Sequence, residues 1–488
     1  MSAASAKKKS EIVIVGAGIV GVCIAYYLTR HPKFSPEHHH ITLLEAKRPA
    51  SGASGKAGGL LAMWAFPQQI VPLSFKLHQE LAEEYNGAAE WGYRGLKTLC
   101  VEGDISRKNP VKKDTASLGL PDDLDWIDKD IIDGWAHLGG ADSTAQVHPY
   151  KFTLFILKKA METGAVDLIT GKVSEILRSA DGEAVGVRYT KDSAAHKHKH
   201  QHHHSHAAAS DSRPQPIRTY PTRNSLHHPK NTTYNKNSIH DEPCEAPPLP
   251  DDAPSPGYSS ESSESIVSTD DDDSILDVDL SEDSDASPEH IPDEPESFTV
   301  HGDQIVLALG PWTSKILPSC PISGLRAHSI TIQPTKPVSP FALFTEMRTS
   351  RTSYVSPEIY PRRDEVYVCG EGDTLADVPE TTDHVQVLRH KCDDLFKNVG
   401  EISPQLRNGK ILKRQACYLP VVDVPSHSGP FIGSTNVDNL YLASGHSCWG
   451  INNAPATGLI MAELLFDGEA KSASIDGLEP EYYFDASQ

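Results

Sequence analysis

The sequence predicts an α/β protein (α+β overall) in which a Rossmann-like domain is joined to a second domain built on an antiparallel sheet. Three observations predict this fold class. A β-branched run, three spaced glycines and a helix-like segment open the chain, alternating apolar segments recur between residues 322 and 419, and a second strand–turn–helix pattern ends it. At 488 residues the chain exceeds what one core usually covers, so two domains are expected.

The first element is a strand followed by a G-x-G-x-x-G turn. Residues 11–45 read EIVIVGAGIVGVCIAYYLTRHPKFSPEHHHITLLE, an order of strand, tight turn, helix and strand that is typical of a dinucleotide site. Such glycines permit the turn, the approach of backbone N–H groups to a pyrophosphate, and close packing of the helix. A carboxylate at the end of the second strand can accept ribose hydroxyls. The expected residues are Gly16, Ala17, Gly18, Ile19, Val20, Gly21, Glu45, Ala46 and Lys47.

A signal anchor is the alternative for this stretch, because three lysines precede the uncharged run 12–28. The run is short for a bilayer, which requires about 20 apolar residues. The anchor also leaves the glycine spacing unexplained, so the dinucleotide site is favoured.

A loop of small residues follows, SGASGKAGGLLA at 51–62. Small residues behind a ribose-binding strand suit a backbone pressed against a flat ring or a second phosphate, although an ordinary flexible loop is the alternative. The residues assigned to the cofactor here are Ser54, Gly55, Lys56, Ala57, Gly58, Gly59 and Leu60.

The middle of the chain predicts helices at 73–85 and 151–164, and strands between 166 and 189. His148 is expected to brace the second helix rather than to perform chemistry. Val173 is assigned to the cofactor site.

Residues 193–297 lose all apolar periodicity. They begin with a histidine-rich run and end in Ser/Asp/Glu clusters, with 7 basic and 21 acidic residues and hence a net charge of -14 out of the total of -21. Too little apolar surface is present to offset the entropy of ordering, so a disordered insertion is predicted. The flanks 185–189 and 298–300 resemble the two strands of one hairpin, and an insertion between them costs little because closure entropy grows slowly with length. A solvated spacer is favoured over a metal-binding, phosphorylated or partner-binding segment.

The remaining sequence contains a buried-type strand, QIVLALGPW at 304–312, then alternating segments at 329–333, 354–357, 365–369 and 410–417 with a helix at 384–396. Ligands lie beyond the carboxyl ends of parallel strands, which favours Ala308, Gly310 and Trp312 as cofactor neighbours. A strand at 439–444, a glycine-rich turn and a helix at 457–466 end the chain. This turn directs N–H groups towards something electron-rich, and the assigned residues are Gly445, His446, Cys448, Trp449, Gly450, Ile451 and Asn452.

Composition excludes several function classes. Neither the insertion nor the rest of the chain has the basic face that nucleic-acid binding requires. The eight cysteines contain no C-x-x-C pair or metal spacing, so no metal site is expected. Without a cleavable signal peptide, they indicate reduced thiols in a cytoplasmic protein with no transmembrane segment.

Taken together, IVIVGAGIVG with Glu45, SGASGKAGGLLA, VHPYKF, IVLALGPWT and LYLASGHSCWGINNAPATG resemble the D-amino-acid oxidase superfamily of FAD enzymes, which includes glycine oxidase and sarcosine oxidase, and within it a fungal branch of oxidoreductases. The resemblance implies an FAD cofactor with the substrate over the flavin, beneath an antiparallel sheet. The expected division is a disordered N-terminus at 1–10, an FAD-binding domain from 11–66, 150–192, 298–320 and 430–488, a substrate domain from 67–149 and 321–429, and the insertion 193–297.

Two departures from the superfamily concern the anchor of a substrate carboxylate. Where glycine oxidase-like members place an arginine, this chain has Leu419, and where sarcosine oxidase-like members use a lysine, it has Asn452. A carboxylate without a cationic partner is poorly held. Arg326, Arg414 or Lys56 are the candidate replacements.

The sequence therefore predicts an FAD-dependent oxidoreductase that takes a hydride from the carbon beside an amine nitrogen of a small molecule. The candidate catalytic residues are His446, Trp449 and Asn452, and Cys417 is a candidate for a covalent bond to the flavin, with an inert buried cysteine as the alternative. A rival function is an FAD-binding interaction protein in endosomal membrane traffic or signalling, which recruits protein partners through 193–297 with little or no turnover. A nicotinamide-dependent dehydrogenase is less favoured, because it gives the small-residue loop and the terminal turn no role.

Overall fold

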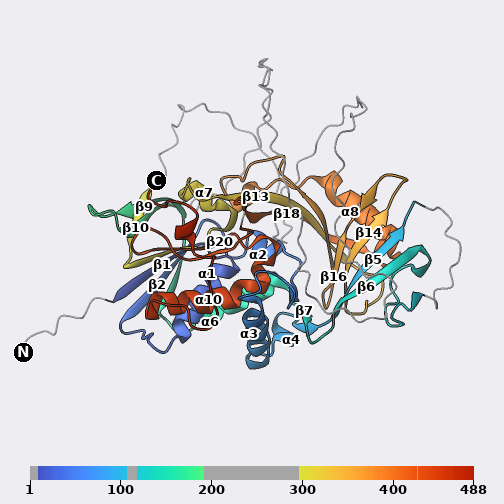
Figure 1. Ribbon diagram of the computed structural model, residues 1–488, viewed down its shortest axis with the longest axis horizontal. Coiled ribbons are helices and arrows are strands. Elements are labelled where there is room, and N and C mark those ends of the chain that lie inside the picture. Colours follow the sequence, from blue (N-terminus) through green and yellow to red (C-terminus); the bar gives the residue numbers. More distant parts are fainter. Residues whose placement is uncertain (1–8, 107–117, 192–295, 426) are drawn as a thin grey trace, which may run out of the picture. The chain divides into compact units, whose positions relative to one another are not determined.

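The computed structural model describes residues 9–106, 118–191, 296–425 and 427–488 (Figure 1). The predicted disordered insertion at 193–297 lies outside these residues except for its last two positions, and the predicted disordered N-terminus lies outside them up to residue 8. The first strand already begins at Ser10.

The dinucleotide-binding pattern forms a six-stranded sheet in the order β19-β20-β12-β1-β2-β8. All neighbours are parallel except the edge strand β19, which is antiparallel to β20. The strands are β1 (Ser10–Val15), β2 (His39–Glu45), β8 (Val166–Thr170), β12 (Gln304–Leu307), β19 (Phe431–Ser434) and β20 (Leu440–Ser444). The Rossmann-like arrangement predicted from the glycine turn is confirmed.

Helices cover one face of this sheet and a small second sheet covers the other. The central strands are apolar on both faces, as burial of both faces requires. The helices are α1 (Ile19–Arg30), α6 (Pro149–Met161) and α10 (Gly450–Asp467), which share one hydrophobic cluster with β1 and β2. The opposite cluster joins β1 and β12 to a three-stranded sheet of β9 (Lys172–Arg178), β10 (Ala184–Thr190) and β11 (Ser297–His301).

The strands on either side of the predicted insertion pair with each other. β10 and β11 are antiparallel, with Tyr189 opposite Phe298 and Thr190 opposite Ser297. The rings of Tyr189 and Phe298 stack with centroids 5.5 Å apart. The predicted hairpin is therefore confirmed.

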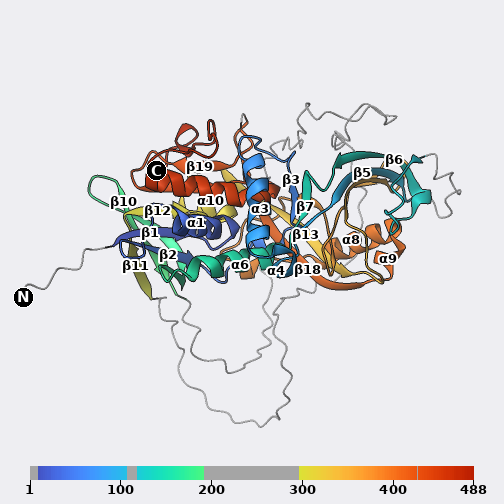
Figure 2. The same cartoon turned by 90° about the horizontal axis from the view of Figure 1, so that it is seen from below.

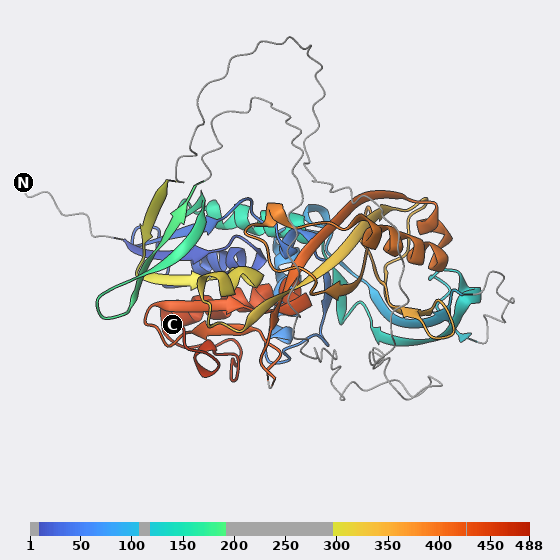
Figure 3. The ribbon, with the colours of Figure 1, turned by 90° about the horizontal axis from the view of Figure 1, so that it is seen from above.

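A larger sheet follows the order β18-β13-β17-β16-β14-β5-β6, with β15 paired to β14. It contains β5 (Lys97–Asp104), β6 (Ile132–Gly139), β13 (Ile322–Gln333), β14 (Phe341–Arg348), β15 (Tyr354–Val355), β16 (Glu358–Pro361), β17 (Val366–Asp373) and β18 (Lys410–Val422). Figure 3 shows the two long strands β13 and β18 running side by side. The expected antiparallel sheet is confirmed with one exception, because β14 and β5 are parallel.

Short elements join the two large sheets. A three-stranded sheet of β3 (Leu60–Ala62), β7 (Thr144–Gln146) and β4 (Arg94–Gly95) contains the end of the small-residue loop. The other helices are α2 (Ala53–Lys56), α3 (Val71–Glu84), α4 (Gly87–Glu90), α7 (Thr313–Ile316), α8 (Arg389–Ile402) and α9 (Pro404–Arg407), with short 3-10 turns such as η3 (Gly310–Trp312) and η5 (Ser447–Trp449).

Helix α3 packs on the nucleotide-binding side of the molecule, although residues 67–149 were assigned to the substrate domain. Its Phe75, Leu77 and Leu81 lie in the hydrophobic cluster of α1 and α10, and Figure 2 shows α3 crossing α10. The predicted division into two domains stays a prediction, and this packing favours moving α3 to the FAD-binding one.

Two helix boundaries were predicted wrongly. The last helix begins at Gly450 instead of residue 457, because neighbouring side chains satisfy the backbone around Pro455, as described below. The helix expected at 384–396 is α8 at Arg389–Ile402, because the backbone is extended at Leu388, whose N–H donates to Nε2 of His328 at 3.0 Å.

Within the described ranges, no helix is long and apolar enough to cross a membrane. The cysteines Cys23, Cys320, Cys369, Cys392, Cys417 and Cys448 are free thiols. Cys100 is disulfide-bonded, contrary to the expectation that every cysteine is reduced.

Candidate functional site

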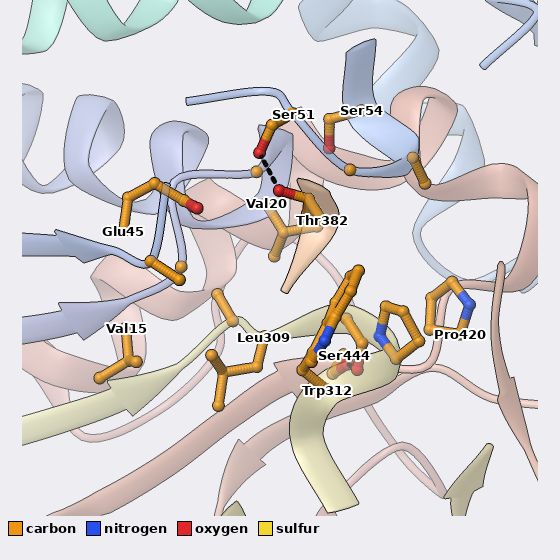
Figure 4. A pocket seen from close by; sticks show the side chains of 18 of the residues that line it. Val15, Val20, Glu45, Ser51, Ser54, Leu309, Trp312, Thr382, Pro420 and Ser444 are labelled. Atoms are coloured by element: carbon orange, nitrogen blue, oxygen red, sulfur yellow. Dashed lines mark hydrogen bonds between the residues drawn. The ribbon is translucent and has the colours of Figure 1, made fainter. Parts of the chain in front are cut away.

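A cavity of about 460 Å³ lies at the carboxyl ends of the parallel strands. This is the expected edge for a ligand in such a sheet. Its wall includes residues from β1, β2 and β20 and the segment that follows β12, and Figure 4 shows Glu45, Ser54 and Trp312 around it. The sequence-predicted residues that line it are Gly16, Gly18, Ile19, Val20, Glu45, Ala46, Ser54, Ala57, Val173, Ala308, Gly310, Trp312, His446, Cys448, Gly450 and Ile451.

The turn between β1 and α1 requires glycine at two positions. Gly16 has φ +110°, and a Cβ there would stand 2.9 Å from the carbonyl carbon of Ala308 and closer still to its oxygen. A Cβ on Gly21 would meet the carbonyl of Gly16. The glycines therefore let the turn, the helix and β12 pack together, as the motif predicts.

The N-terminus of α1 offers donors to the cavity. The hydroxyl oxygen of Ser54 accepts the N–H of Ile19 at 2.9 Å. The amides of Gly18 and Val20 have no acceptor among the residues that the structure describes, and both residues line the cavity. Free N–H groups at the positive end of a helix suit a phosphate group.

Glu45 lies at the end of β2 and points its carboxylate into the cavity (Figure 4). It accepts the N–H groups of Ala17 and Lys47, each at 3.0 Å. Burial raises the pKa of Glu45, and these backbone hydrogen bonds oppose the rise. The two N–H groups fix the carboxylate and leave acceptor capacity for the hydroxyls of a ribose.

Residues 374–388, here called the strap, connect β17 to α8 and lie along the cavity. Glu380, Thr381 and Thr382 are part of its wall. Thr382 and Ser51 join their hydroxyl oxygens at 2.8 Å, the dashed line of Figure 4, and Trp312 donates Nε1–H to the carbonyl of Pro379 at 2.7 Å. The strap thus ties a segment of the large sheet to the nucleotide-binding sheet.

Charge pairs also hold the strap. Glu380 is bound by Lys172 at the start of β9 and by Lys315 of α7, the latter at 2.9 Å. Hydrogen bonds from the two lysines lower the pKa of Glu380 to about 2. All three side chains line the cavity, and because one carboxylate faces two ammonium groups, the cluster keeps one net positive charge at its rim.

The opposite end of the cavity is formed by the terminal turn and the N-terminus of α10, where Gly450 and Ile451 line the wall. Pro455 lies inside this helix and cannot donate to the carbonyl of Ile451. His78 of α3 donates Nε2–H to that carbonyl at 2.8 Å instead, while Ser74 Oγ accepts the N–H of Ala456 at 3.1 Å. Because α3 supplies these partners, the helix begins at the cavity and directs its positive end there.

Two of the three candidate catalytic residues, His446 and Asn452, form side-chain hydrogen bonds within the protein. His446 pairs Nε2 with the hydroxyl of Thr457 at 3.0 Å, and burial lowers its pKa to about 3. Asn452 accepts the N–H of Ala62 at 2.9 Å and donates to the side chain of Asn453. These contacts favour structural roles for both, and their catalytic roles remain untested predictions.

Trp449 belongs to the terminal turn and packs against the segment after β3. Its ring meets Trp64 at 5.4 Å and Phe66 at 6.2 Å between centroids, both edge to face. The ring is 9% exposed, and its Nε1–H has no acceptor in the described part of the chain. Trp91 and Trp126 of the core have the same unpartnered Nε1–H over the described residues, so this feature alone does not mark Trp449 as a ligand contact.

The small-residue loop packs against protein at its two central glycines. A Cβ on Gly58 would overlap the ring of Tyr360, and one on Gly59 would meet Val147 and Pro149. Arg362 holds the loop from outside by donating to the carbonyl of Ala57 at 2.6 Å. The glycines thus permit close packing of the loop, and neither lines the cavity.

Other predicted residues also lie outside the cavity wall: Ala17, Gly21, Lys47, Gly55, Lys56, Gly58, Gly59, Leu60, Gly445, Trp449, Asn452 and Cys417. Cys417 is 5% exposed on β18, and burial raises its pKa to about 11. A thiol that stays protonated at neutral pH is a poor nucleophile. This favours the inert alternative for Cys417.

The two arginines considered as carboxylate anchors are occupied. Arg326 forms a buried pair with Asp373, with Nη2 2.9 Å from Oδ1. Arg414 binds Asp393 of α8, with Nη2 2.7 Å from Oδ1. Lys56 is half-buried, and burial lowers its pKa.

Sequence reasoning missed the strap and its partners. The strap residues follow no motif, and they enter the site only because β17 returns the chain to the nucleotide-binding sheet. Further missed residues of the wall are Ser51, Gly52, Lys172, Lys315, Glu380, Thr381, Thr382, Leu419, Pro420 and Ser444. Pro311 and Ser447, which adjoin assigned residues, could have been found by extending the glycine turns.

Comparison with known proteins gives relatives over nearly the whole chain. "Putative oxidoreductase TDA3" of Saccharomyces cerevisiae is 41% identical over 574 aligned residues, covering 98% of this chain and 96% of the relative. "Putative oxidoreductase C1F5.03c" of Schizosaccharomyces pombe is 31% identical over 477 residues, covering 96% and 98%.

Solved structures share the fold at low identity. L-proline dehydrogenase from P. horikoshii has a TM-score of 0.57 at 17% identity, covering 97% of both chains. Glycine oxidase from Geobacillus kaustophilus has a TM-score of 0.56 at 13% identity, covering 97% of this chain and 98% of the other.

The family described as "DAO: FAD dependent oxidoreductase" matches residues 11–208 and 282–464. FAD fits the geometry above, because the cavity joins free amides at a helix N-terminus and a fixed carboxylate to a second helix N-terminus. The chain therefore belongs to the DAO family of FAD-dependent oxidoreductases, and its cofactor is FAD.

Proposed function

We propose that the protein oxidises a C–N bond of an amine or amino-acid-like small molecule by hydride transfer to FAD. The observation that supports this most is one cavity whose wall includes Glu45, the N-terminus of α10, and Leu419 and Pro420 of β18 in the large sheet. In this proposal the adenosine half of FAD would lie at Glu45, and the flavin half would lie at the terminal turn.

The chain's own groups then have distinct tasks. The amides of Gly18 and Val20 bind the pyrophosphate, and Glu45 accepts the ribose hydroxyls. The N-terminus of α10 stabilises negative charge on the flavin through its dipole. FAD supplies a two-electron acceptor when bound, which no side chain can provide.

Proton transfer does not use His446 in this proposal. Its pKa of about 3 keeps the imidazole neutral above pH 4, and Thr457 fixes its Nε2. The ring therefore positions the terminal turn rather than accepting a proton from the substrate. Oxidation of an amine requires only that its nitrogen be deprotonated before the hydride leaves the adjacent carbon, and the resulting imine is hydrolysed by water.

The test is an anaerobic absorption titration of the yellow protein with amino acids, N-methyl amines, simple amines and NAD(P)H. Bleaching by an amine or amino acid supports the proposal. If none of them reduces a flavin that dithionite does reduce, the proposal is refuted.

A second candidate is an FAD-binding interaction protein of endosomal traffic or signalling. The observation that favours it is the lack of charge at the two positions where relatives of the superfamily were expected to anchor a carboxylate, since Leu419 is apolar and Asn452 is bonded within the protein. Deletion of residues 193–297 separates the two candidates: turnover survives it, whereas recruitment of a partner does not. The cytoplasmic location stays a prediction.

A further inference from the structure

Two polar side chains of the large sheet contact one carboxyl group. Tyr360 of β16 donates its hydroxyl to Oε2 of Glu358, and Cys369 of β17 points its Sγ to the same oxygen at 3.5 Å. Burial raises the pKa of Glu358 above its ordinary value. Carboxyl groups are rarely surrounded by protein without a partner of opposite charge, so this one needs a function.

This cluster borders the terminal turn. The pKa of the Cys448 thiol is raised to about 12, mainly by burial and next by the charge of Glu358. Since this electrostatic effect requires proximity, Cys448 and Glu358 lie near each other. Cys448 lines the cavity assigned to FAD. Although protein surrounds them, Cys448 is exposed, and Glu358 and Cys369 are partly accessible. Because Cys448 lines the cavity, the cluster adjoins the end of the cavity that the terminal turn forms.

Aromatic side chains pack beside this cluster. Phe344 meets Tyr360 at 5.9 Å and Trp64 at 5.8 Å between ring centroids, and Trp64 meets Trp449 at 5.4 Å. They come from β14, β16, the segment after β3 and the terminal turn. Aromatic faces attract an ammonium group in addition to excluding water.

No basic side chain of the described chain is among the groups that act on Glu358. The influences on its pKa are burial, Tyr360 and Cys369. Arg326 and Arg414 are bound to other carboxylates. The charged groups that act on the pKa of Lys56 are Cys417, Asp383 and Arg48, and Glu358 is not among them.

We propose that Glu358, supported by Tyr360, binds the ammonium group of an amine substrate that carries no carboxylate on the reacting carbon. This rests on the proposed oxidation of amines by FAD and deepens it by naming the substrate class. An α-carboxylate would lie against an uncompensated carboxylate and aromatic walls, whereas an ammonium group supplies the missing positive charge.

The experiment compares ligands that differ only in charge. The FAD-loaded protein is titrated without oxygen with benzylamine, with phenylglycine of either hand, which adds one carboxylate to the same carbon, and with uncharged benzyl alcohol. Either a shift or a bleaching of the flavin absorption reports occupancy. We expect half-saturation by benzylamine at a concentration at least about 10-fold below that for phenylglycine and for benzyl alcohol, since a hydrogen bond between charged groups is roughly twice as strong as a neutral one.

The variants identify the residue responsible. Glu358→Gln keeps the shape and removes the charge, and we expect a 10- to 100-fold weaker response to benzylamine, roughly the worth of a charged hydrogen bond. Glu371→Gln is the matched control, because Glu371 is an exposed carboxylate of β17 in the same sheet. Tyr360→Phe is the second variant, with a smaller loss of about 3- to 10-fold.

The outcomes separate this inference from the proposed function. Phenylglycine acting as well as benzylamine, or a Glu358→Gln protein that responds like the unaltered one, overturns the ammonium site even if an amino acid bleaches the flavin. A shift by benzylamine that depends on Glu358, without bleaching by any amine or amino acid, supports the site and refutes the oxidation. Should Glu358→Gln fail to retain FAD, the Tyr360→Phe response decides.

Discussion

Replacement of Gly16 by alanine tests whether the turn between β1 and α1 is required in its present form. Gly16 has φ +110°, which lies outside the conformations that alanine adopts readily. The added Cβ would stand 2.9 Å from the carbonyl carbon of Ala308, whereas ordinary contacts begin at 3.4 Å. Because the obstacle is backbone of β12 and not a flexible side chain, the strand itself must move.

The free-energy cost has two parts. A positive φ costs an L-residue about 1–2 kcal/mol, and overpacking a filled core costs about 1–3 kcal/mol. We therefore expect Gly16→Ala to lower the free energy of unfolding by roughly 2–5 kcal/mol and the midpoint of thermal unfolding by about 3–6 °C. The shifted strand carries Ala308 of the cavity wall, so FAD affinity should fall as well. Thermal unfolding with and without added FAD, and a titration of the apoprotein, measure both effects.

Gly164→Ala is the matched control. Gly164 also has positive φ, +69°, but a Cβ there meets nothing within 4 Å. It should cost about 1 kcal/mol, through backbone strain alone, and leave FAD affinity unchanged. Equal destabilisation by the two variants, or full FAD affinity in Gly16→Ala, would refute the reasoning from the contact with β12.

Three further predictions concern single side chains. Glu45→Gln should weaken FAD binding roughly 10- to 100-fold. An uncharged amide has only one acceptor oxygen, so it cannot accept the N–H groups of both Ala17 and Lys47 and is no longer held in place for the ribose. Fluorescence titration of the apoprotein measures the affinity. Glu358→Gln should raise thermal stability at neutral pH. The pKa of Glu358 is raised in the folded state, so its ionisation costs stability as the pH rises. The gain from the variant should vanish below the ordinary pKa of 4.5, and thermal unfolding curves from pH 4 to 8 measure this. Acid precipitation should release all yellow colour into the supernatant, because the pKa of Cys417 is about 11, and a coloured pellet that becomes colourless in Cys417→Ala would contradict this.

The nucleotide-binding half was predictable because its signals are local. Gly16 adopts a positive φ in the turn, Gly21 is required by a contact with the carbonyl of Gly16, and Glu45 ends a strand whose register follows from its apolar run. The hairpin on either side of the insertion could be recognised for the same reason, since β10 and β11 both carry alternating apolar residues. Local backbone geometry restricts the residue types that a position can accept, and it can therefore be predicted from the sequence.

The substrate half was less predictable because its contacts join distant segments. Ser74 and His78 appear only as polar residues of an amphipathic helix, yet they complete the backbone of α10 about 380 residues later. Glu358 and Tyr360 lie in a four-residue strand whose meaning depends on the terminal turn across from it. The spacing of residues along the sequence does not predict such contacts between distant segments.

The strap makes retention of the cofactor a property of both sheets. It follows β17 of the large sheet, yet Trp312 and Ser51 hold it along the cavity at the end of β1 and β2. We therefore expect the release of FAD from this cavity to require local opening of these contacts, so that the lifetime of the holoprotein depends on the strap as well as on the affinity of the phosphate turn. Bound FAD should in turn favour the docked strap.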